Sequence, residues 1–587
     1  MNTLNIPGFS SGDQARGLQN FITDIRNCTS REAEQMRIDK ELANIRHKFS
    51  SPATLSPYQR KKYVWKLVYI FTLGYEVDFG HMEIIALISS GKFSEKSVGY
   101  VAVSLLMKSD NEMMTLVVNS VRNDLLSHNN YFQSLALASI ANIGGAEFAE
   151  ALTPDVQRVL TSKDTDAVVR KKAALCLLKL FRTNPDNITH PEWAPQMARL
   201  LEERHLGVLL SAMSLLIALA SKAPGDYELC VPYVIALLSR LVLTPRAVME
   251  DYLYYNTPSP WLQVKFLKFL QLYPPPQDGT QAERLSDSLK KILTHTAVSD
   301  TVNKSNADHA VLFEALNVVL SQGQAAHAGL KGQALTLLGR FISVKEPNIR
   351  YLGLEALGRF AQLTEGKGAD EGINKHMSTV FVSLKDADIS VRRQALDLVF
   401  AMCDHSNARE IVGELATNLA TADAGIREEM VLKIAVLAER YATDLRWYVD
   451  TVLQLIHLAG DYVSDDVWHR IIQIVTGHKE LQSYAAENVF RALEARTVHE
   501  SAVLVGGYVL GEFGYLIAEQ PGMGGEAQFG VLQVGREGGR DGWKKGRRGG
   551  KLERNEEQHS PPPPFFPPSL CYRSILGGPR RGRRRCC

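Results

Sequence analysis

The chain has 587 residues, which is too long for one compact hydrophobic core and long enough for several domains or one continuous array of repeats. Hydrophobic residues make up 45% and charged residues 22% of the sequence, as in a soluble folded protein. The formal net charge is only +2, so overall charge gives no argument for nucleic acid as a partner.

The N-terminal residues lack the apolar segment of a secretory signal, and we expect a cytoplasmic protein. The longest apolar stretch, residues 207–220, is too short to span a bilayer and is expected to be a buried helix. Any contact with a membrane is then peripheral and made through the protein surface.

The cysteines suggest neither a disulfide framework nor a metal site. Cys28, Cys176, Cys230 and Cys403 are widely spaced without a CxxC pair, and no set of His and Cys residues has zinc spacing. Cys176 and Cys403 lie in apolar helical runs, where reduced, buried thiols are expected. The sequence predicts no metal site and no cofactor.

Apolar residues recur with the helical period from about Gln14 to Ala518, and strand-like alternation is hard to find. Short polar turns separate the helical runs. This pattern predicts an all-α fold, a HEAT/armadillo-like α-solenoid superhelix in which paired helices cover one another's apolar faces. We assign the helical-repeat trunk to residues 1–520.

Four segments share a turn, a β-branched residue, an arginine and then an apolar helix. Their arginines are Arg170, Arg350, Arg392 and Arg427. The last three are about 42 and 35 residues apart, near the period of HEAT and armadillo repeats. We interpret them as a structural ladder, with the β-branched residue buried between repeats and the arginine held over the next turn. A catalytic or anion-binding row is the alternative.

The helical pattern ends near Gln520, and residues 521–587 are rich in Gly, Pro and Arg. This tail has 14 basic and 6 acidic residues and no apolar face, so we expect it to be disordered. Its basic clusters resemble a nuclear or RNA-binding signal, but a solvated tail or a mistranslated end is the preferred interpretation.

Residues 56–74, SPYQRKKYVWKLVYIFTLG, carry the most information. Ser56 suits an N-cap, Pro57 the first helical position, and Gln59 completes a capping box. The apolar face is expected to hold Val64, Leu67, Val68 and Phe71, and roughly the opposite face Tyr58, Lys62 and Lys66.

Basic side chains crowd the start of this helix, where Arg60, Lys61 and Lys62 lie within about one turn. A helix N-terminus already carries about half a positive charge, so cations there destabilise the helix unless an anion binds. We predict a polyanion site, such as one for a phosphoinositide headgroup, which Arg46 and Lys48 of the preceding helix join. From the residues alone, a solvated run of charges is an equal alternative.

No catalytic motif is found: the sequence lacks a P-loop, a G-x-S-x-G, an H-E-x-x-H and a Gly-rich loop after a strand. His81 and Glu83 do not share a helix face, and we take them as structural. Trp261 follows prolines at a helix start, and we expect it to pack in the core. The sequence therefore predicts a protein that is not an enzyme and has no catalytic residue.

Several stretches resemble the alpha-adaptins, large subunits of the plasma-membrane clathrin adaptor complex. They include GLQNFITDIRNC, RKKYVWKL, YYNTPSPWLQVKFLKFLQLYPPP and RWYVDTVLQLIHLAGDYVSDDVW, and they follow the family's order from about Gly17 to Ala518. The resemblance implies a scaffold for clathrin-mediated endocytosis and vesicle transport. Its implied partners are beta, mu and sigma subunits, membranes with phosphatidylinositol 4,5-bisphosphate, cargo with dileucine signals and, indirectly, clathrin.

The resemblance also implies roles for single residues. The family's phosphoinositide-binding positions fall on Lys48, Tyr58, Arg60, Lys61, Lys62 and Lys66. Arg26 resembles the family's arginine that contacts the acidic residue of a dileucine signal, beside the sigma subunit. These roles imply a peripheral location at clathrin-coated pits.

In the family, further trunk helices, a hinge and an ear follow the last matching stretch. None is visible in this sequence, so we expect a trunk without ear-dependent recruitment. Two alternatives stay open: a solenoid subunit of another vesicle-coat adaptor, or a nuclear-transport-type carrier that uses the basic tail.

Overall fold

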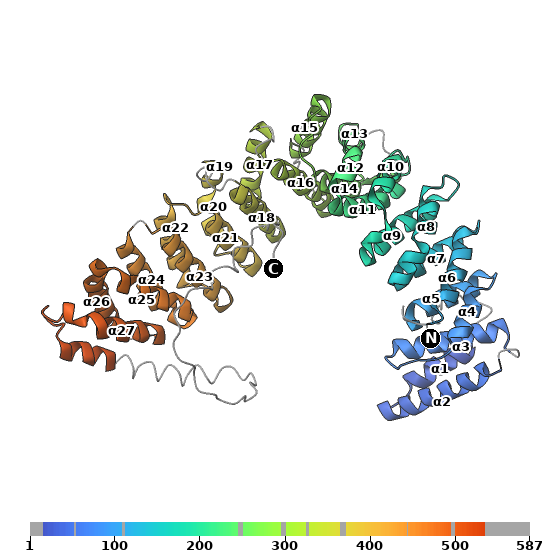
Figure 1. Cartoon of the computed structure of the whole chain (residues 1–587), viewed down its shortest axis with the longest axis horizontal. Helices are drawn as coiled ribbons and strands as arrows, with labels where there is room; N and C mark the ends of the chain where they lie inside the picture. Colours follow the sequence, from blue (N-terminus) through green and yellow to red (C-terminus); the bar gives the residue numbers. More distant parts are fainter. Residues whose placement is uncertain are drawn as a thin grey trace, which may run out of the picture. The chain divides into compact units, whose positions relative to one another are not determined.

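The structure is a computed structural model that describes residues 16–51, 55–107, 112–244, 250–294, 301–323, 328–363, 371–442, 444–494 and 499–533. These residues are almost entirely helical, and their one sheet is a pair of two-residue strands (Figure 1). The predicted all-α repeat fold is therefore confirmed. The chain forms two compact units, which meet between Glu414 and Leu415 in the sequence and are described separately.

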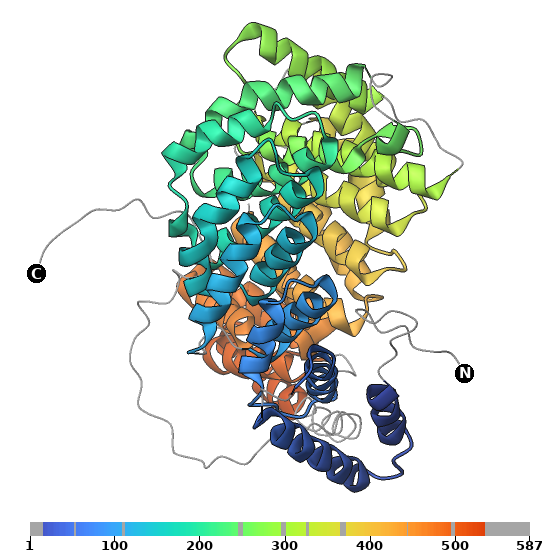
Figure 2. The same cartoon turned by 90° about the vertical axis from the view of Figure 1, so that its right-hand side faces the viewer.

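Helices of the first unit form two rows, and they follow one another in chain order in Figures 1 and 2. Consecutive helices of the first row pack side by side, and each second-row helix packs against a first-row helix. The first row is α3 (Pro57–Thr72), α5 (Phe93–Leu106), α7 (Asn130–Ile143), α9 (Ala167–Thr183), α11 (Leu206–Lys222), α14 (Pro260–Leu270), α16 (Val302–Ser321), α18 (Pro347–Leu363) and α21 (Ile389–Met402). The second row is α4 (His81–Ile88), α6 (Met114–Leu126), α8 (Ala146–Thr161), α10 (His190–Leu200), α13 (Val231–Leu243), α15 (Gly279–Thr294), α17 (Ala328–Phe341) and α20 (Met377–Ser383).

Two helices precede these rows, and several short elements connect helices within the rows. The preceding helices, α1 (Arg16–Arg26) and α2 (Arg31–Phe49), both pack against α3. The short helices are α12 (Pro224–Tyr227) and α19 (Glu371–Asn374), with 3-10 turns at η2 (Pro185–Asn187), η3 (Glu228–Cys230) and η5 (Glu250–Tyr252).

The second unit continues the helical pattern. Its helices are α23 (Ala424–Arg440), α24 (Leu445–Ala459), α25 (Asp465–Gly477), α26 (Lys479–Leu493) and α27 (Glu500–Phe513), with 3-10 turns at η7 (Gly460–Tyr462) and η8 (Gly514–Leu516). Helix α22 (Ala408–Leu419) spans the division between the units. Residues 525–533 are also helical, beyond the domain boundary expected at residue 520, and most of the tail lies outside the described residues.

Burial of α11 and of three thiols follows the expectations from sequence. Helix α11 contains the long apolar stretch, and none of residues 206–220 is exposed, although one side of the helix is only half-buried. No described helix is long and apolar enough to cross a membrane. Cys176, Cys230 and Cys403 are buried free thiols, whereas Cys28 is half-buried. Burial raises the pKa of the Cys176 thiol to about 12, which makes it a poor nucleophile.

The four repeated arginines link each helix start to the backbone of the preceding turn or helix, instead of lying over the next turn. Arg350 Nη1 donates to Lys345 O at 2.6 Å and to Val344 O at 2.9 Å. The carbonyl bonds of the other three are Arg170 to Leu160 (3.2 Å), Arg392 to Asp386 (2.6 Å) and Arg427 to Ala422 (2.7 Å). These bonds satisfy carbonyls that the ends of helices leave free.

Arg170 and Arg350 also reach the following repeat. Arg170 pairs with Glu203 at 2.5 Å, and Arg350 pairs with Asp386 at 2.6 Å. The adjacent β-branched residues Val169, Val391 and Ile426 are buried as expected, while Ile349 is half-buried. The structural interpretation of the arginine row is therefore confirmed.

A short hairpin precedes α14 and contradicts one expectation. Strands β1 (Leu253–Tyr254) and β2 (Thr257–Pro258) pair antiparallel, with Tyr254 opposite Thr257. Trp261 follows the hairpin as the second residue of α14 and is 57% exposed, so the expectation of core packing is wrong. The neighbouring Leu262 takes the inward position and is only 1% exposed.

We expect Arg350→Met to lower the free energy of unfolding by about 2 kcal/mol, because the apolar stem is kept while two hydrogen bonds to backbone carbonyls and a largely buried ion pair are lost. Urea unfolding followed by far-ultraviolet circular dichroism measures the change. Arg199→Met is the matched control, since Arg199 is exposed on α10 and its side chain has no hydrogen bond within the described residues. Equal stability of the two variants would contradict a structural role for Arg350.

Candidate functional site

The start of α3 has the predicted capping geometry. Ser56 is the N-cap, and its hydroxyl accepts a hydrogen bond from the Gln59 backbone at 3.3 Å. The Gln59 side chain accepts from the Ser56 backbone at 3.1 Å, which completes the capping box, and Pro57 is the first helical residue. The cap fixes where α3 begins and therefore where its basic side chains are placed.

Lys66 turns inward and forms a buried ion pair. Its Nζ lies 2.5 Å from Oε1 of Glu41 on α2, and both side chains are 7% exposed. Arg37 pairs with the other oxygen of Glu41 at 2.9 Å and with Asp24 of α1 at 3.0 Å. Acidic and basic groups from α1, α2 and α3 therefore form one charge network beside the ring of Phe21.

The network favours the ionised form of Glu41. Burial raises the pKa of this carboxyl, but hydrogen bonds from Lys66 and Arg37, together with their charges, outweigh burial and hold the pKa below its usual value. The pair links α2 to α3 across 25 residues of sequence. Lys66 is thus an internal structural group in this structure, with little surface left for an external ligand.

Two further predicted residues are also turned away from solvent. Arg60 is half-buried and pairs with Glu83 in the first turn of α4. Lys61 is only 6% exposed. The structural interpretation of Glu83 is confirmed by this pairing, which offsets the positive charge at the start of α3.

The other predicted residues, Lys48, Tyr58 and Lys62, reach the surface, and we call them the basic surface. Lys48 is exposed near the end of α2, Tyr58 is 36% exposed, and Lys62 is half-buried. Within the described residues, no carboxylate forms an ion pair with Lys48 or Lys62.

Lys62 lies among like charges. Its Nζ is 4.6 Å from the centroid of the Tyr63 ring, and the side chain runs beside Gly17 at the start of α1. Burial lowers the pKa of Lys62 most, the positive charges of Lys66 and Lys48 lower it further, and the negative charge of Glu41 offsets part of this effect. An anion bound at this position would relieve that repulsion.

Arg46 belongs to a different environment from the one expected. It pairs with Asp78 at 3.1 Å, and its guanidinium lies 4.4 Å from the centroid of the Phe79 ring. Since Asp78 already offsets its charge, Arg46 adds less to the basic surface than the sequence indicated.

Arg26, the predicted cargo contact, is the exposed last residue of α1. No carboxylate pairs with it within the described residues.

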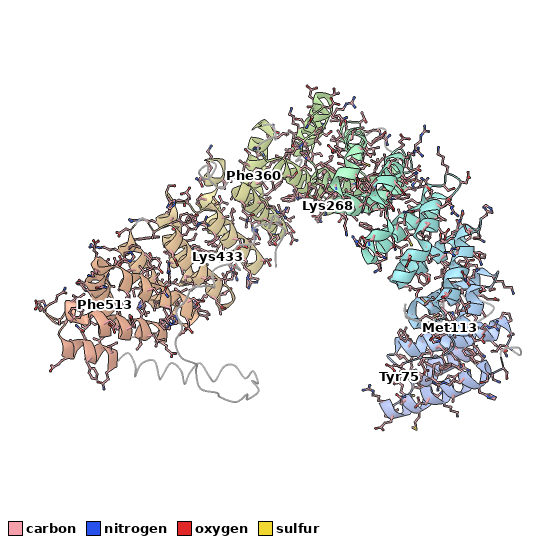
Figure 3. All side chains as sticks on the ribbon, viewed as in Figure 1. Tyr75, Met113, Lys268, Phe360, Lys433 and Phe513 are labelled. Atoms are coloured by element: carbon pink, nitrogen blue, oxygen red, sulfur yellow. The ribbon has the colours of Figure 1, made fainter. Side chains whose placement is uncertain are left out.

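Sequence reasoning missed an open cavity of about 680 Å³ nearby in the chain, where the turn between α1 and α2 faces the end of α3. It is lined by Cys28, Thr29, Ser30, Arg31, Glu34, Gln35, Leu73, Gly74 and Tyr75, of which Figure 3 labels Tyr75.

The chain matches the family of the adaptin N-terminal region over residues 34–529. It is 50% identical over 517 residues to AP-2 complex subunit alpha-1 of Arabidopsis thaliana, covering 88% of this chain and 50% of that protein. It is 48% identical over 519 residues to AP-2 complex subunit alpha-2 of Dictyostelium discoideum, covering 88% and 52%. The chain thus spans about half the length of the curated relatives it matches.

Among solved structures, a chain from a structure of Kap95p with RanGDP aligns with a TM-score of 0.51. The alignment covers 92% of this chain and 66% of that chain at 12% sequence identity. At such low identity the likeness is one of fold, and it agrees with the helical-repeat architecture described above.

We expect Lys66→Met to lower the free energy of unfolding by about 3 kcal/mol, because the buried Glu41 then lacks one of its two cationic partners. Urea unfolding measures the change. The double variant Glu41→Gln/Lys66→Met should recover part of the loss, since it removes both charges. Lys40→Met, at an exposed position of α2, is the control and should change little. An equally stable Lys66→Met protein would contradict the structural role of the pair.

Acid should weaken the network through Glu41. Because the folded-state pKa of Glu41 lies below the unfolded value near 4.5, its contribution is present above that pH and is lost as pH falls through the folded pKa. The stability difference between the wild type and Glu41→Gln should therefore shrink as pH falls from about 6 to 3. Thermal unfolding across this range checks the sign, and a difference that grows with acidity would refute it.

Proposed function

The chain belongs to the adaptin family, and from this premise we propose that it is an alpha-type large subunit of a clathrin adaptor complex, a scaffold rather than an enzyme. The observation that carries the proposal is the 50% identity to an AP-2 alpha subunit along 88% of the chain. The family model matches residues 34–529, which contain nearly all of the described helices.

As such a subunit, the chain assembles with beta, mu and sigma chains and works at clathrin-coated pits on the plasma membrane. Clathrin is then reached indirectly, through the assembled complex. The helical rows offer exposed apolar side chains for contacts with other subunits, such as Leu105 (40% exposed), Leu175 (48%) and Leu432 (53%). Isolated exposed apolar residues are common on soluble proteins, so these support the proposal without carrying it.

The basic surface is the proposed site for phosphatidylinositol 4,5-bisphosphate. Lys48 and Lys62 supply cations without an ionic partner among the described residues, and the Tyr58 hydroxyl supplies a further hydrogen-bond donor. The other assigned residues, Arg60, Lys61 and Lys66, then act chiefly by fixing α3 and its charge. Because one basic residue near a membrane contributes only about 1 kcal/mol, several contacts and partner subunits must act together.

Arg26 is proposed to bind the acidic residue of a dileucine cargo signal. Its exposure at the end of α1 and its lack of an ionic partner in the described region support this role. A guanidinium offers paired donors that match both oxygens of a carboxylate.

The alternatives from sequence receive less support. The likeness to the Kap95p structure concerns the fold at 12% identity and gives no argument for a nuclear-transport carrier. An adaptor of another compartment is distinguished by its lipid preference, which the following experiment measures.

We expect the full chain to bind liposomes that contain phosphatidylinositol 4,5-bisphosphate more strongly than liposomes without it. Lys48→Gln/Lys62→Gln should weaken this binding by about tenfold, because two accessible cations are lost. Co-sedimentation at physiological salt measures bound protein. These residues are chosen over Lys61 and Lys66, whose burial would mix loss of binding with loss of fold.

Lys40→Gln/Lys172→Gln is the matched control, because it removes the same charge from exposed positions on α2 and α9. It should bind as the wild type does. Equal weakening by both double variants would mean that net charge alone drives binding. Preference for a different phosphoinositide would favour the adaptor of another compartment.

A further inference from the structure

An exposed aromatic cluster stands at the start of α14, and we define it as Tyr254, Tyr255 and Trp261. The ring centroid of Tyr254 lies 4.8 Å from that of Tyr255 and 4.8 Å from that of Trp261, with interplanar angles of 81° and 68°. Trp261 is 57% exposed and Tyr255 is 46% exposed. Tyr254 is half-buried and contacts both of the other rings, and the exposed faces of Tyr255 and Trp261 leave apolar surface that packing within the chain does not require.

The backbone that carries these rings is held in an unfavourable conformation. Tyr255, Asn256 and Ser259 have φ angles of 46°, 66° and 40°, in the left-handed region that residues other than glycine seldom adopt. Tyr255 and Asn256 are the two central residues of the hairpin, where a type I′ turn requires positive φ, so the turn itself accounts for these two angles and fixes the Tyr255 ring beside Tyr254.

Specific contacts hold the hairpin in place. The Ser259 backbone donates to Tyr252 O at 2.8 Å, and Gln263 Nε2 donates to Pro258 O at 2.6 Å. The hydroxyl of Thr257 donates to Asp308 of α16 at 2.7 Å. The aromatic cluster is therefore fixed before any ligand arrives, which lowers the entropy that binding costs.

We propose that the aromatic cluster binds a proline-rich peptide segment of a partner protein, with basic residues beside the prolines. A polyproline II helix has three residues per turn and no internal hydrogen bonds, so its proline rings pack on aromatic ridges while its carbonyls remain free acceptors. The steep angles between neighbouring rings give an uneven apolar surface against which proline rings can pack.

Hydrogen-bond donors accompany the apolar surface. The exposed Trp261 indole N–H has no acceptor within the described residues. The Tyr255 hydroxyl accepts a hydrogen bond from Asn303 at 2.9 Å, which leaves its own hydrogen to donate. Both donors suit the free carbonyls of a polyproline II chain.

Nearby charge indicates the sign of the ligand. Glu250 and Asp251, in the 3-10 turn before β1, are both exposed and form no ion pair within the described residues. Carboxylates in the turn that leads into the aromatic cluster attract Arg or Lys next to the proline run and thereby set the direction of the bound peptide. A small quaternary ammonium ion also suits aromatic rings and carboxylates, but it needs an enclosing cage, and the high exposure of Trp261 favours an extended ligand.

A labelled synthetic peptide tests the proposal with the full chain. The probe is SPPPPFFPPS, which is the sequence of residues 560–569 of this chain, with two arginines added after it. Fluorescence anisotropy should show saturable binding in the micromolar range. Trp261→Ala and, separately, Tyr255→Ala should each weaken binding by about tenfold, as expected for central aromatic contacts. Glu250→Gln/Asp251→Asn should weaken binding and reduce its dependence on salt.

Tyr131→Ala is the matched control, because Tyr131 is an aromatic residue on α7 that is 71% exposed. It should bind the peptide as the wild type does, and circular dichroism should show the same helix content for all variants. The proposal is overturned if no saturable binding occurs, if binding survives both aromatic substitutions, or if a peptide with glycine in place of proline binds equally well. Competition by tetramethylammonium that abolishes binding would instead assign the cluster to a cationic ligand.

Discussion

Each pair of helices in this fold has more apolar surface than it can cover by itself. Helix α9 packs against α7, α8 and α11, and most residues of α11 are buried by its neighbours. Burial contributes roughly 25 cal/mol for each Å² of apolar surface, so an unstacked pair would lose most of its stabilisation. Polar groups are subject to a similar requirement. The arginines between repeats donate hydrogen bonds to backbone carbonyls in the turns between helices.

This constraint also shapes the basic surface. Helix α3 packs against α1 and α2 as well as α4 and α5, so a cation placed on either covered face must find a carboxylate. Glu41 and Glu83 meet that requirement for Lys66 and Arg60. Lys48 and Lys62 form no ion pair with a carboxylate within the described residues. The cluster of positive charge is therefore divided into cations that hold the helices together and cations that stay available to a ligand.

The sequence predicted local features well and long-range ones poorly. The capping box depends on Ser56 and Gln59 alone, and it was found as expected. Phe71 was assigned to the apolar face but is 39% exposed, and Lys66 was assigned to the solvent face but is buried. A helix covered on two sides has no single solvent face, and helical periodicity does not reveal how many neighbours a helix has. Nor does the sequence show that Glu41 and Lys66 meet across 25 residues.

Stacking of helix pairs in rows limits each helix largely to contacts with its neighbours. Within the first row, α5, α7, α9 and α11 separate α3 from α14. A ligand bound at the start of α3 thus has no shared side chain through which to alter the hairpin before α14. The binding free energies of one ligand at the start of α3 and another at the hairpin should then be additive. When both ligands lie on one membrane-attached partner, the two affinities combine as a product. An array of this kind can detect the coincidence of two weak signals without any change in conformation.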